Sequence, residues 1–357
     1  MNLKKDILIK NNASIKDAMI QLNETGESCL LVVNNKENFL GTITDGDIRR
    51  NLIKDTNINS SIKKIYNSNS QIVREKDFQI DLIKDIMLNY KIDLVPIISS
   101  DRKVINFFSW EEIFKYKKVK NEKFKKSPQL VIMAGGKGSR LKPFTDILPK
   151  PLIPFENKTI IESILDNFQL YGVKSSFITI NYKSRIIKSY FEELDVNYKV
   201  KFIEEKKPLG TAGSLKLIEK NLSDSFFLTN CDTLIDANYV DIMNYHKKNK
   251  FLITLVASSK DYIIPYGVCK LLKNGTLKEI DEKPKTNLLI NIGLYILDPS
   301  IIKKIPNNKY YDMTQLIQKI NKNKNKVGIY PIHDNSWKDI GQWDEYKSAL
   351  EFNYLNE

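Results

Sequence analysis

One stretch near residue 135 constrains the fold of this chain more than any other. After Gln129, residues 130–134 form an unbroken apolar run, which is typical of a strand buried on both faces of a parallel sheet. A glycine-rich loop follows at once at residues 135–140 (Gly-Gly-Lys-Gly-Ser-Arg), and it closes at residues 149–152 (Pro-Lys-Pro-Leu). Because glycines let backbone N–H groups approach an anion, this pattern predicts a phosphate site at the end of a sheet strand.

The loop differs from two common nucleotide-binding loops. A P-loop needs a four-residue gap followed by Gly-Lys-Ser/Thr, and the dinucleotide fingerprint needs a third glycine where Leu141 stands. Two cations lie close to this loop instead, Arg140 and Lys150, the second between two prolines. Two fixed positive charges beside one glycine loop are typical of a site for a triphosphate substrate.

The segment from Ala134 to Pro151 resembles the signature of the sugar-1-phosphate nucleotidyltransferases, the nucleotide-sugar pyrophosphorylases. Further blocks follow in that family's order, at residues 204–215, 227–232, 279–284, 291–295 and 336–341. The resemblance implies that residues 128–357 form an α/β catalytic domain, Rossmann-like and of the GT-A type, with a mixed, mainly parallel sheet.

The resemblance also implies roles for the residues that match the family's motifs. The catalytic residues would be Arg140, Lys150, Asp232 and Lys283. The nucleotide would be bound by Ala134, Gly135, Gly136, Gly138, Glu205 and Gly210. The sugar phosphate would be bound by Glu282, Lys283 and Asn291, and the metal by Asp232 and Asp339. The two aspartates are far apart in the chain, so the sequence alone does not bring them together.

The family's reaction converts an NTP and a sugar 1-phosphate into an NDP-sugar and pyrophosphate. Repulsion between the two anionic substrates opposes in-line attack on the α-phosphorus, so catalysis should come from positioning and charge neutralisation. Mg²⁺ suits this task because it prefers carboxylates and phosphate oxygens. Arg140 would hold the β- and γ-phosphates, Lys150 would neutralise the reacting centre, and Lys283 would grip the sugar phosphate.

The sequence also bears on which NTP and which sugar 1-phosphate are the substrates. Residues 230–232 and 264–269, taken with the pattern of residues 1–118, look most similar to the GTP-dependent glucosamine-1-phosphate guanylyltransferases of nonulosonic (legionaminic) acid synthesis, a surface-glycan precursor pathway. Mannose-1-phosphate guanylyltransferases and glucose-1-phosphate uridylyl- or thymidylyltransferases are the alternatives. Too few residues follow Gly341 for the appended acyltransferase of a bifunctional enzyme, so we expect none.

Residues 1–118 show an internal duplication. A helix, strand, turn and strand pattern at residues 14–43, with Ser14 as the helix cap, recurs at residues 78–108. It resembles a pair of cystathionine-β-synthase (CBS) motifs, a Bateman module, which implies a regulatory adenine nucleotide between the repeats. Thr44 and Asp47 would hold its ribose, and the second repeat lacks that aspartate. A purely packing or dimerising module is the alternative.

Charge and composition indicate which ligands the protein binds and where it is located. The Lys-rich segment 119–127 has no sustained apolar period and precedes a proline, which predicts a linker. The net charge of +13 is spread over both parts and comes mostly from lysine, so it favours phosphorylated small molecules over nucleic acid. No apolar run suits a membrane span or a signal peptide. The three scattered cysteines favour a reducing cytoplasm, and the resemblance implies a homo-oligomer.

Two other function classes remain open at this point. A catalytically silent nucleotide-sensing regulator should have lost some cationic or acidic positions, yet all those named above are present. A transferase for another acceptor, such as a molybdopterin or phosphocholine precursor, should lack the Glu-Lys-Pro at residues 282–284 and the Trp-x-Asp-Ile-Gly at residues 337–341, and both are present.

Overall fold

The chain forms two compact units, Met1–Lys115 and Tyr116–Glu357. The computed structural model describes residues 5–52, 57–90, 92–114, 122–194, 196, 199–322, 327–332 and 336–354. The predicted linker begins outside the described residues, at 119–121, and its later part packs on the second unit. The backbone N–H of Phe124 donates to the carbonyl of Tyr171 (2.9 Å), and the Phe124 ring centroid lies 6.0 Å from that of Phe227.

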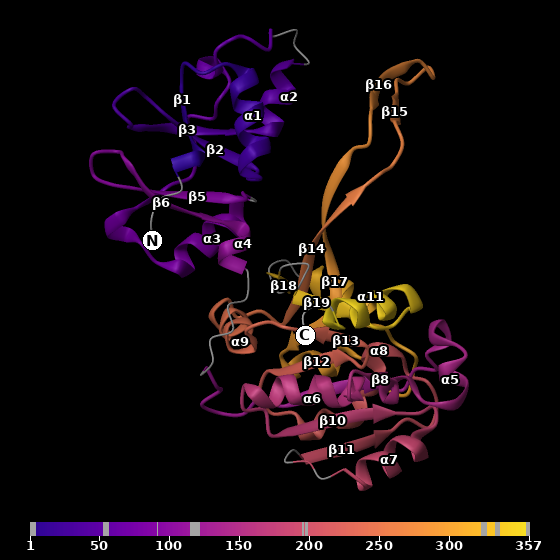
Figure 1. Ribbon diagram of the computed structural model, residues 1–357. Helices are drawn as coiled ribbons and strands as arrows, with labels where there is room; N and C mark the ends of the chain where they lie inside the picture. The colour runs from indigo at the N-terminus through magenta and orange to yellow at the C-terminus, as the bar shows by residue number, and fades with distance from the viewer. Residues whose placement is uncertain are drawn as a thin grey trace. The chain divides into compact units, whose positions relative to one another are not determined.

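The first unit consists of two three-stranded sheets with the same order and pairing (Figure 1). In each sheet the first strand pairs parallel with the second, and the second pairs antiparallel with the third. The strands are β1 (Leu8–Lys10), β2 (Cys29–Val33), β3 (Phe39–Thr44), β4 (Val73–Arg74), β5 (Leu94–Ile98) and β6 (Val104–Ser109). The helices are α1 (Ile15–Thr25), α2 (Asp45–Leu52), α3 (Ile80–Tyr90) and α4 (Trp110–Phe114), with 3₁₀ turns η1 (Lys5–Ile7), η2 (Ile62–Lys64) and η3 (Glu75–Asp77). The repeated topology confirms the predicted duplication.

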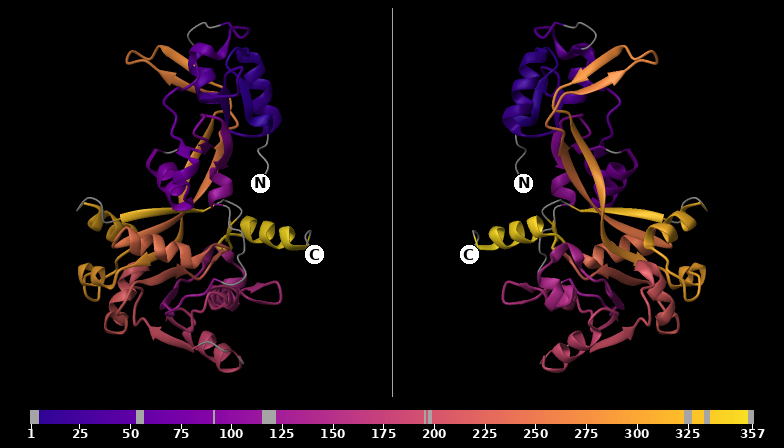
Figure 2. Two further views of the ribbon diagram at one scale, coloured as in Figure 1. Left: turned by 90° about the vertical axis from the view of Figure 1, so that its left-hand side faces the viewer. Right: turned by 90° about the vertical axis from the view of Figure 1, so that its right-hand side faces the viewer.

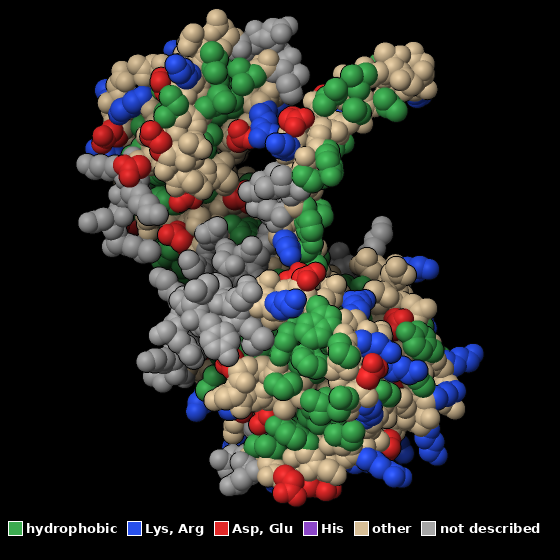
Figure 3. All heavy atoms as spheres, turned by 45° about the vertical axis from the view of Figure 1, so that its right-hand side comes forward, with side chains coloured by type: hydrophobic (Ala, Val, Ile, Leu, Met, Phe, Trp, Pro, Cys, Tyr) green, Lys and Arg blue, Asp and Glu red, His purple; other side chains and the backbone are tan. Residues whose placement is uncertain are grey.

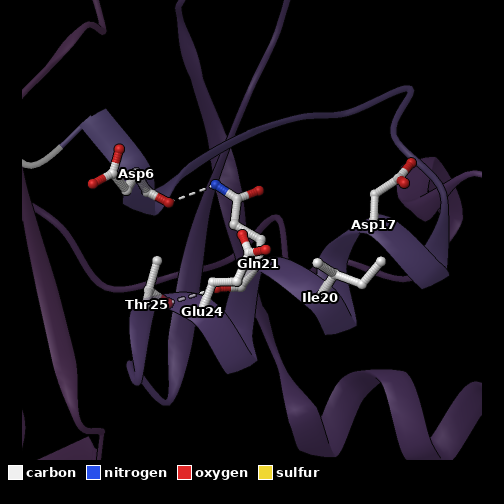
Figure 4. A pocket seen from close by; sticks show the side chains of 6 residues that line it. All are labelled: Asp6, Asp17, Ile20, Gln21, Glu24 and Thr25. Carbon is white, nitrogen blue, oxygen red and sulfur yellow. Dashed lines mark hydrogen bonds between the residues drawn. The ribbon is translucent and has the colours of Figure 1, made fainter.

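Local chemistry explains how the first repeat begins. Ser14 caps α1 as predicted, because its hydroxyl accepts from the N–H of Asp17 (3.1 Å) while the Asp17 carboxylate accepts from the N–H of Ser14 (2.9 Å). Figure 4 shows how Gln21 ties α1 to the start of the chain: its amide donates to the carbonyl of Asp6 (2.5 Å). The same amide donates to the carbonyl of Leu8 (2.9 Å), so the helix holds the first strand in place.

The second unit is built on a seven-stranded mixed sheet in the order β11-β10-β7-β12-β17-β14-β18. β7, β10, β11 and β12 are parallel, β17 is antiparallel to both neighbours, and β14 pairs parallel with β18. The strands are β7 (Leu130–Ala134), β10 (Ser175–Ile180), β11 (Lys199–Glu204), β12 (Phe226–Asn230), β14 (Ile253–Ile263), β17 (Lys285–Leu297) and β18 (Val327–Ile332). Short pairs join β8 (Pro154–Phe155) to β9 (Lys158–Thr159), β13 (Thr233–Ile235) to β19 (Trp337–Asp339), and β15 (Val268–Leu271) to β16 (Leu277–Asp281).

Helices cover the sheet, and the central strand is buried on both faces. The α-helices are α5 (Phe144–Ile147), α6 (Ile160–Leu170), α7 (Ser184–Glu192), α8 (Gly210–Gly213), α9 (Tyr239–Lys248), α10 (Met313–Asn321) and α11 (Trp343–Tyr354). The 3₁₀ helices are η4 (Ser139–Leu141), η5 (Lys150–Leu152), η6 (Ser214–Asn221) and η7 (Pro299–Lys304). Along β7, Leu130 and Ile132 join the core cluster that contains α6, while Val131 joins the cluster that contains η6 and α10. This alternation confirms that the apolar run is a strand buried on both faces.

A long two-stranded ribbon leaves the sheet where β14 and β17 continue beyond it. Their pairing runs from Ala257↔Asn291 to Ile263↔Lys285, and the β15–β16 hairpin closes its far end. Both views of Figure 2 show this ribbon projecting from the sheet. Large apolar side chains are exposed along it, as the space-filling view also shows (Figure 3): Tyr262, Ile264, Tyr266, Leu271, Leu272, Leu277, Ile280, Leu288 and Leu289.

Candidate active site

The glycine loop begins where β7 ends. Gly138 has a φ of +67°, and a Cβ there would lie 2.9 Å from the Thr145 side chain and 3.0 Å from Cβ of Lys150. The Thr145 hydroxyl also donates to the Gly138 carbonyl (2.9 Å), which folds the loop back on itself. Only glycine fits at position 138, because the backbone is left-handed and the space beside it is filled. By contrast, a Cβ at Gly136 would meet nothing within 4 Å. The loop is therefore closed at Gly138 and open at Gly136, the side from which a ligand can approach.

The structure brings the two distant aspartates together. Asp232 follows β12, and Asp339 ends β19, whose partner strand β13 begins directly after Asp232. In this pair Thr233 lies opposite Asp339, and the N–H of Ile340 donates to the Asp232 carbonyl (2.8 Å). The point where Gly341 would carry a Cβ lies 2.5 Å from Asp232 Oδ2 and 2.8 Å from Asp339 Oδ1. Both carboxylates thus converge on one point, and Gly341 keeps that point free of a side chain.

Lys150 completes this charged cluster. Its ammonium forms an ion pair with Asp232 and lies 3.0 Å from the same Cβ position of Gly341. Burial alone would lower the pKa of Lys150, but the negative charges of Asp232 and Asp339 outweigh it and raise that pKa. Lys150 is therefore a fixed cation, held by the carboxylates at the mouth of the glycine loop. Arg140, in contrast, has an exposed side chain on the outer part of the loop.

The carboxylate pair fits the ligand preference of Mg²⁺. This ion commonly takes one or two carboxylates and completes its octahedron with water and substrate phosphates. Within the described ranges, no group of three or more His, Cys, Asp or Glu side chains could enclose a metal alone. Two convergent carboxylate oxygens beside an open glycine loop therefore suit a metal that arrives with a phosphate substrate. Asp232 and Asp339 would hold it.

Glu205 lies on the other side of the glycine loop, at the end of β11. Its carboxylate accepts from the N–H of Leu209 (3.0 Å), and its Oε1 lies 3.0 Å from the point where Gly135 would carry a Cβ. Burial of this side chain, which is 7% exposed, raises the pKa of Glu205. Gly135, directly after Ala134 at the end of β7, therefore leaves room for this acid, and the two predicted nucleotide-binding residues are neighbours.

Neighbouring residues of the chain leave no room for a side chain at Gly210. Its φ is +76°, and a Cβ there would lie 2.8 Å from the carbonyl oxygen of Tyr311 and 2.9 Å from the Asp312 carboxylate. The N–H groups of Ala212 and Gly213 both donate to that Tyr311 carbonyl (2.9 Å each). The segment around Gly210, which is predicted to bind the nucleotide, is thus fastened to the residues that precede α10. Packing within the chain by itself explains why a glycine stands here.

The structure leaves the predicted sugar-phosphate residues apart from the carboxylates. Glu282 and Lys283 lie at the base of the distal hairpin, and Lys283 has a φ of +46°. Gly293 packs directly against the Asn230 side chain, beside Asp232. Lys283 precedes Gly293 by ten positions, most of them in β17, which is roughly 30 Å of extended chain. Asn291 is nearer the sheet, where its amide donates to the Tyr295 hydroxyl (2.8 Å) and its oxygen accepts from the N–H of Gly293 (3.2 Å).

Two residues beside the loop were not predicted. The Lys183 ammonium donates to the carbonyls of Asp146 (2.6 Å) and Ile147 (2.7 Å), and the Tyr182 hydroxyl donates to that of Thr145 (3.4 Å). They follow β10, the neighbour of β7, and they hold the far side of the glycine loop. Their only sequence signal is their place after a buried strand, which does not show that they contact the loop.

The first unit contains a cavity of about 390 Å³ lined by residues of both repeats, among them Thr44 and Asp47. The Asp47 carboxylate accepts from the hydroxyl of Thr44 (2.7 Å) and from its N–H (3.0 Å), and it pairs with Arg50 (2.7 Å). Thr44 and Asp47, the two residues predicted to contact the ribose, are thus hydrogen-bonded to each other at the start of α2.

The second repeat has an equivalent pair. Ser109 and Glu112 exchange two hydrogen bonds of 3.2 Å. The second repeat thus has a glutamate, Glu112, at the position where the first repeat has Asp47.

Known protein families match both parts of the chain. Residues 129–354 match the sequence profile of the family described as nucleotidyl transferase, and residues 3–54 match that of the CBS domain. A mannose-1-phosphate guanyltransferase of Yarrowia lipolytica is 39% identical over 187 residues, which cover 49% of this chain and 50% of the relative. Mannose-1-phosphate guanylyltransferase 1 of Arabidopsis thaliana is 30% identical over 230 residues, 62% of this chain and 63% of the relative. The chain thus spans about half to two thirds of these relatives.

A solved structure shares the fold. UDP-glucose pyrophosphorylase complexed with UDP-glucose aligns with a TM-score of 0.50 at 18% identity, over 65% of this chain and all of that one. This likeness supports the α/β fold of the second unit. Among the residues described, no helix combines the length and the apolar character that crossing a membrane requires.

Proposed function

Because the chain belongs to the nucleotidyl transferase family, we propose that it transfers a guanylyl group from GTP to a hexose 1-phosphate, releasing pyrophosphate. The observation that carries this proposal is the convergence of Asp232, Asp339 and Lys150 on one point beside the glycine loop. A silent regulator has no need for such a cluster. Guanylyl transfer is further supported by the relatives described above, which are mannose-1-phosphate guanylyltransferases.

The proposed chemistry is an in-line displacement at the α-phosphorus. A phosphate oxygen of the sugar 1-phosphate forms the new P–O bond, the bond to the bridging α,β-oxygen breaks, and pyrophosphate leaves with that electron pair. Mg²⁺ held by Asp232 and Asp339 would supply positive charge at the reacting phosphate. Lys150 adds a second fixed charge there, and Arg140 binds the β- and γ-phosphates. The chain contributes charge and position, so no covalent intermediate is required.

Two sugar phosphates are candidates for the acceptor. The motif combination described above favours glucosamine 1-phosphate, whereas the names of the curated relatives favour mannose 1-phosphate. Glu282, Lys283 and Asn291 are proposed to bind the sugar phosphate, and for Glu282 and Lys283 this requires the ribbon to bend toward the sheet. These residues carry the hydroxyl acceptors and the cation that a sugar phosphate needs.

One assay tests the proposed function. Pyrophosphate release would be measured for the full chain with Mg²⁺, each of the four NTPs, and glucosamine, mannose and glucose 1-phosphates. We expect the highest kcat/KM with GTP and one of the first two sugars. The Asp232→Asn variant gives the background rate. Release no faster than this background for every pair would refute the transferase and favour the silent regulator.

We also propose that an adenine nucleotide regulates the protein through the first unit. Support comes from the cavity lined by Thr44 and Asp47 and from the match to the CBS profile. Differential scanning fluorimetry with AMP and ATP would test it, with Thr44→Val as the altered cavity. An unchanged melting temperature for both nucleotides would favour a packing or dimerising role. A homo-oligomer is part of the same proposal, and light scattering on the purified chain would test it.

A further inference from the structure

Trp343 joins the C-terminal helix to the glycine loop. It is the first residue of α11, and its indole Nε1 donates to the carbonyl of Lys142 (2.7 Å). Its ring also packs on Phe144, with 4.9 Å between centroids and 43° between planes. Lys142 and Phe144 lie on the stretch between Arg140 and Lys150. One side chain therefore contacts the loop at two points, through a hydrogen bond and through an aromatic contact.

The segment that precedes Trp343 is tied to both aspartates. It follows Gly341 by two residues, and the N–H of Gly341 donates to Asp339 Oδ1 (2.8 Å). One residue earlier, Ile340 bonds the Asp232 carbonyl. The segment before α11 is thus fixed to the same cluster that would hold the metal. The indole thereby links this fixed segment to the glycine loop through its contacts with Lys142 and Phe144.

The far side of the loop is held separately. Tyr182 and Lys183 bond the carbonyls of residues 145–147, so they fix the end that leads to Lys150. The end next to Arg140 is held by Trp343 at Lys142. Arg140 has an exposed side chain, so the path of its backbone decides where its guanidinium can reach. The buried Leu141, whose N–H donates to the Gly138 carbonyl (3.0 Å), and the indole contact at Lys142 together fix that path.

We propose that Trp343 is a positioning residue that sets the distance between the Arg140 end of the glycine loop and the Asp232–Asp339 carboxylate pair. This inference rests on the function proposed above. The β- and γ-phosphates of the NTP, and the pyrophosphate formed from them, must reach the loop cation and the carboxylate-bound metal together. A fixed separation favours binding because no further ordering is needed. The sugar 1-phosphate does not span this distance, so its binding is independent of Trp343.

Kinetics in both directions test the proposal with a matched control. Trp343→Phe keeps an aromatic ring against Phe144 but removes the N–H that Lys142 accepts. Tyr346→Phe removes a hydrogen bond of equal length from the same helix, the one that the hydroxyl donates to the carbonyl of Pro154 (2.7 Å), outside the loop. We expect Trp343→Phe to raise the KM for NTP and, in the reverse reaction, for pyrophosphate by about threefold to tenfold. The KM for the sugar phosphate should stay within about twofold, and Tyr346→Phe should change none of the three.

A second variant and a binding measurement keep the test decisive. Phe144→Leu alters the aromatic contact from the loop side, and because Phe144 is exposed it should fold even if Trp343→Phe does not. It should raise the same two KM values. Calorimetric titration of the full chain with inorganic pyrophosphate and Mg²⁺ needs no turnover, so it separates this proposal from a failure of the proposed reaction. Unchanged pyrophosphate affinity in Trp343→Phe, an equal shift in the sugar-phosphate KM, or an equal effect of Tyr346→Phe would each overturn the positioning role.

Discussion

Replacing Gly341 by alanine tests whether the charged cluster is the reacting centre. The new methyl group would stand 2.5 Å from Asp232 Oδ2, 2.8 Å from Asp339 Oδ1 and 3.0 Å from Lys150 Nζ. Ordinary contact begins at 3.4 Å. Asp232 must therefore retreat by about 0.9 Å and Asp339 by about 0.6 Å, unless the backbone moves as a whole. The substitution moves all three groups at once while leaving each of them chemically intact.

The expected effect on rate is large, and the effect on stability is small. A misplacement of about 1 Å at a reacting centre costs on the order of 10²-fold in rate. Overpacking costs about 1–3 kcal/mol, and replacing glycine by alanine regains roughly 0.4–1 kcal/mol from the unfolded chain. The melting temperature should therefore fall by only a few degrees, about 2–4 °C for each kcal/mol in a domain of this size. The rate should fall far more than the lost stability can explain.

Pyrophosphate release at saturating NTP and sugar phosphate, with calorimetry on the same samples, measures both effects. Gly46→Ala serves as the control for an added methyl group, because its nearest neighbour there is the flexible guanidinium of Arg50 at 3.2 Å. Gly341→Ala with a kcat close to that of the unaltered chain would refute the reasoning. It would show that the three groups tolerate a shift, and hence that the chemistry takes place elsewhere.

Three further predictions concern Asp232, Gly136 and His246. Asp232→Asn should lose at least about 10²-fold in kcat, the scale of one preorganised charge, and a near-normal turnover would remove Asp232 from the site. Gly136→Ala should raise the KM for NTP without lowering the melting temperature, because its methyl group meets no protein atom within 4 Å; a loss of stability instead would show that the loop is closed there. Burial lowers the pKa of His246 to about 4, so the unfolded chain takes up a proton first as the pH falls from about 6.5. Between pH 7 and pH 5 the free energy of unfolding should thus drop by about 2 kcal/mol more than in His246→Gln, and equal drops in chemical denaturation at the two pH values would contradict the burial argument.

Strand and helix positions were largely predictable from the chain alone. The apolar run at residues 130–134 is a doubly buried strand because its neighbours on both faces demand apolar side chains at every position. Ser14 could be identified as the helix cap because capping is a local pattern, here the four residues from Ser14 to Asp17. The duplicated pattern of the first unit was visible for the same reason. Local propensity and side-chain periodicity carry this information.

The reasons behind two residue identities are visible only in the folded chain. The carbonyl of Tyr311 lies where a side chain at Gly210 would stand. Glu112 pairs with Ser109 in the second repeat as Asp47 pairs with Thr44 in the first. A glycine or an acid in a sequence shows that a position is special, but it does not show which neighbour makes it so.

The sequence by itself determined the kind of fold, the order of the motifs and the chemical groups available to the site. Tertiary structure decided which of those groups meet. Asp232 and Asp339 converge because β13 and β19 pair in one particular register, and such a pairing between distant segments leaves no trace in local periodicity. The same long-range packing leaves Lys283 on the ribbon and seats Trp343 on the loop. Contacts of this kind depend on the whole set of packed neighbours, so only the folded chain reveals them.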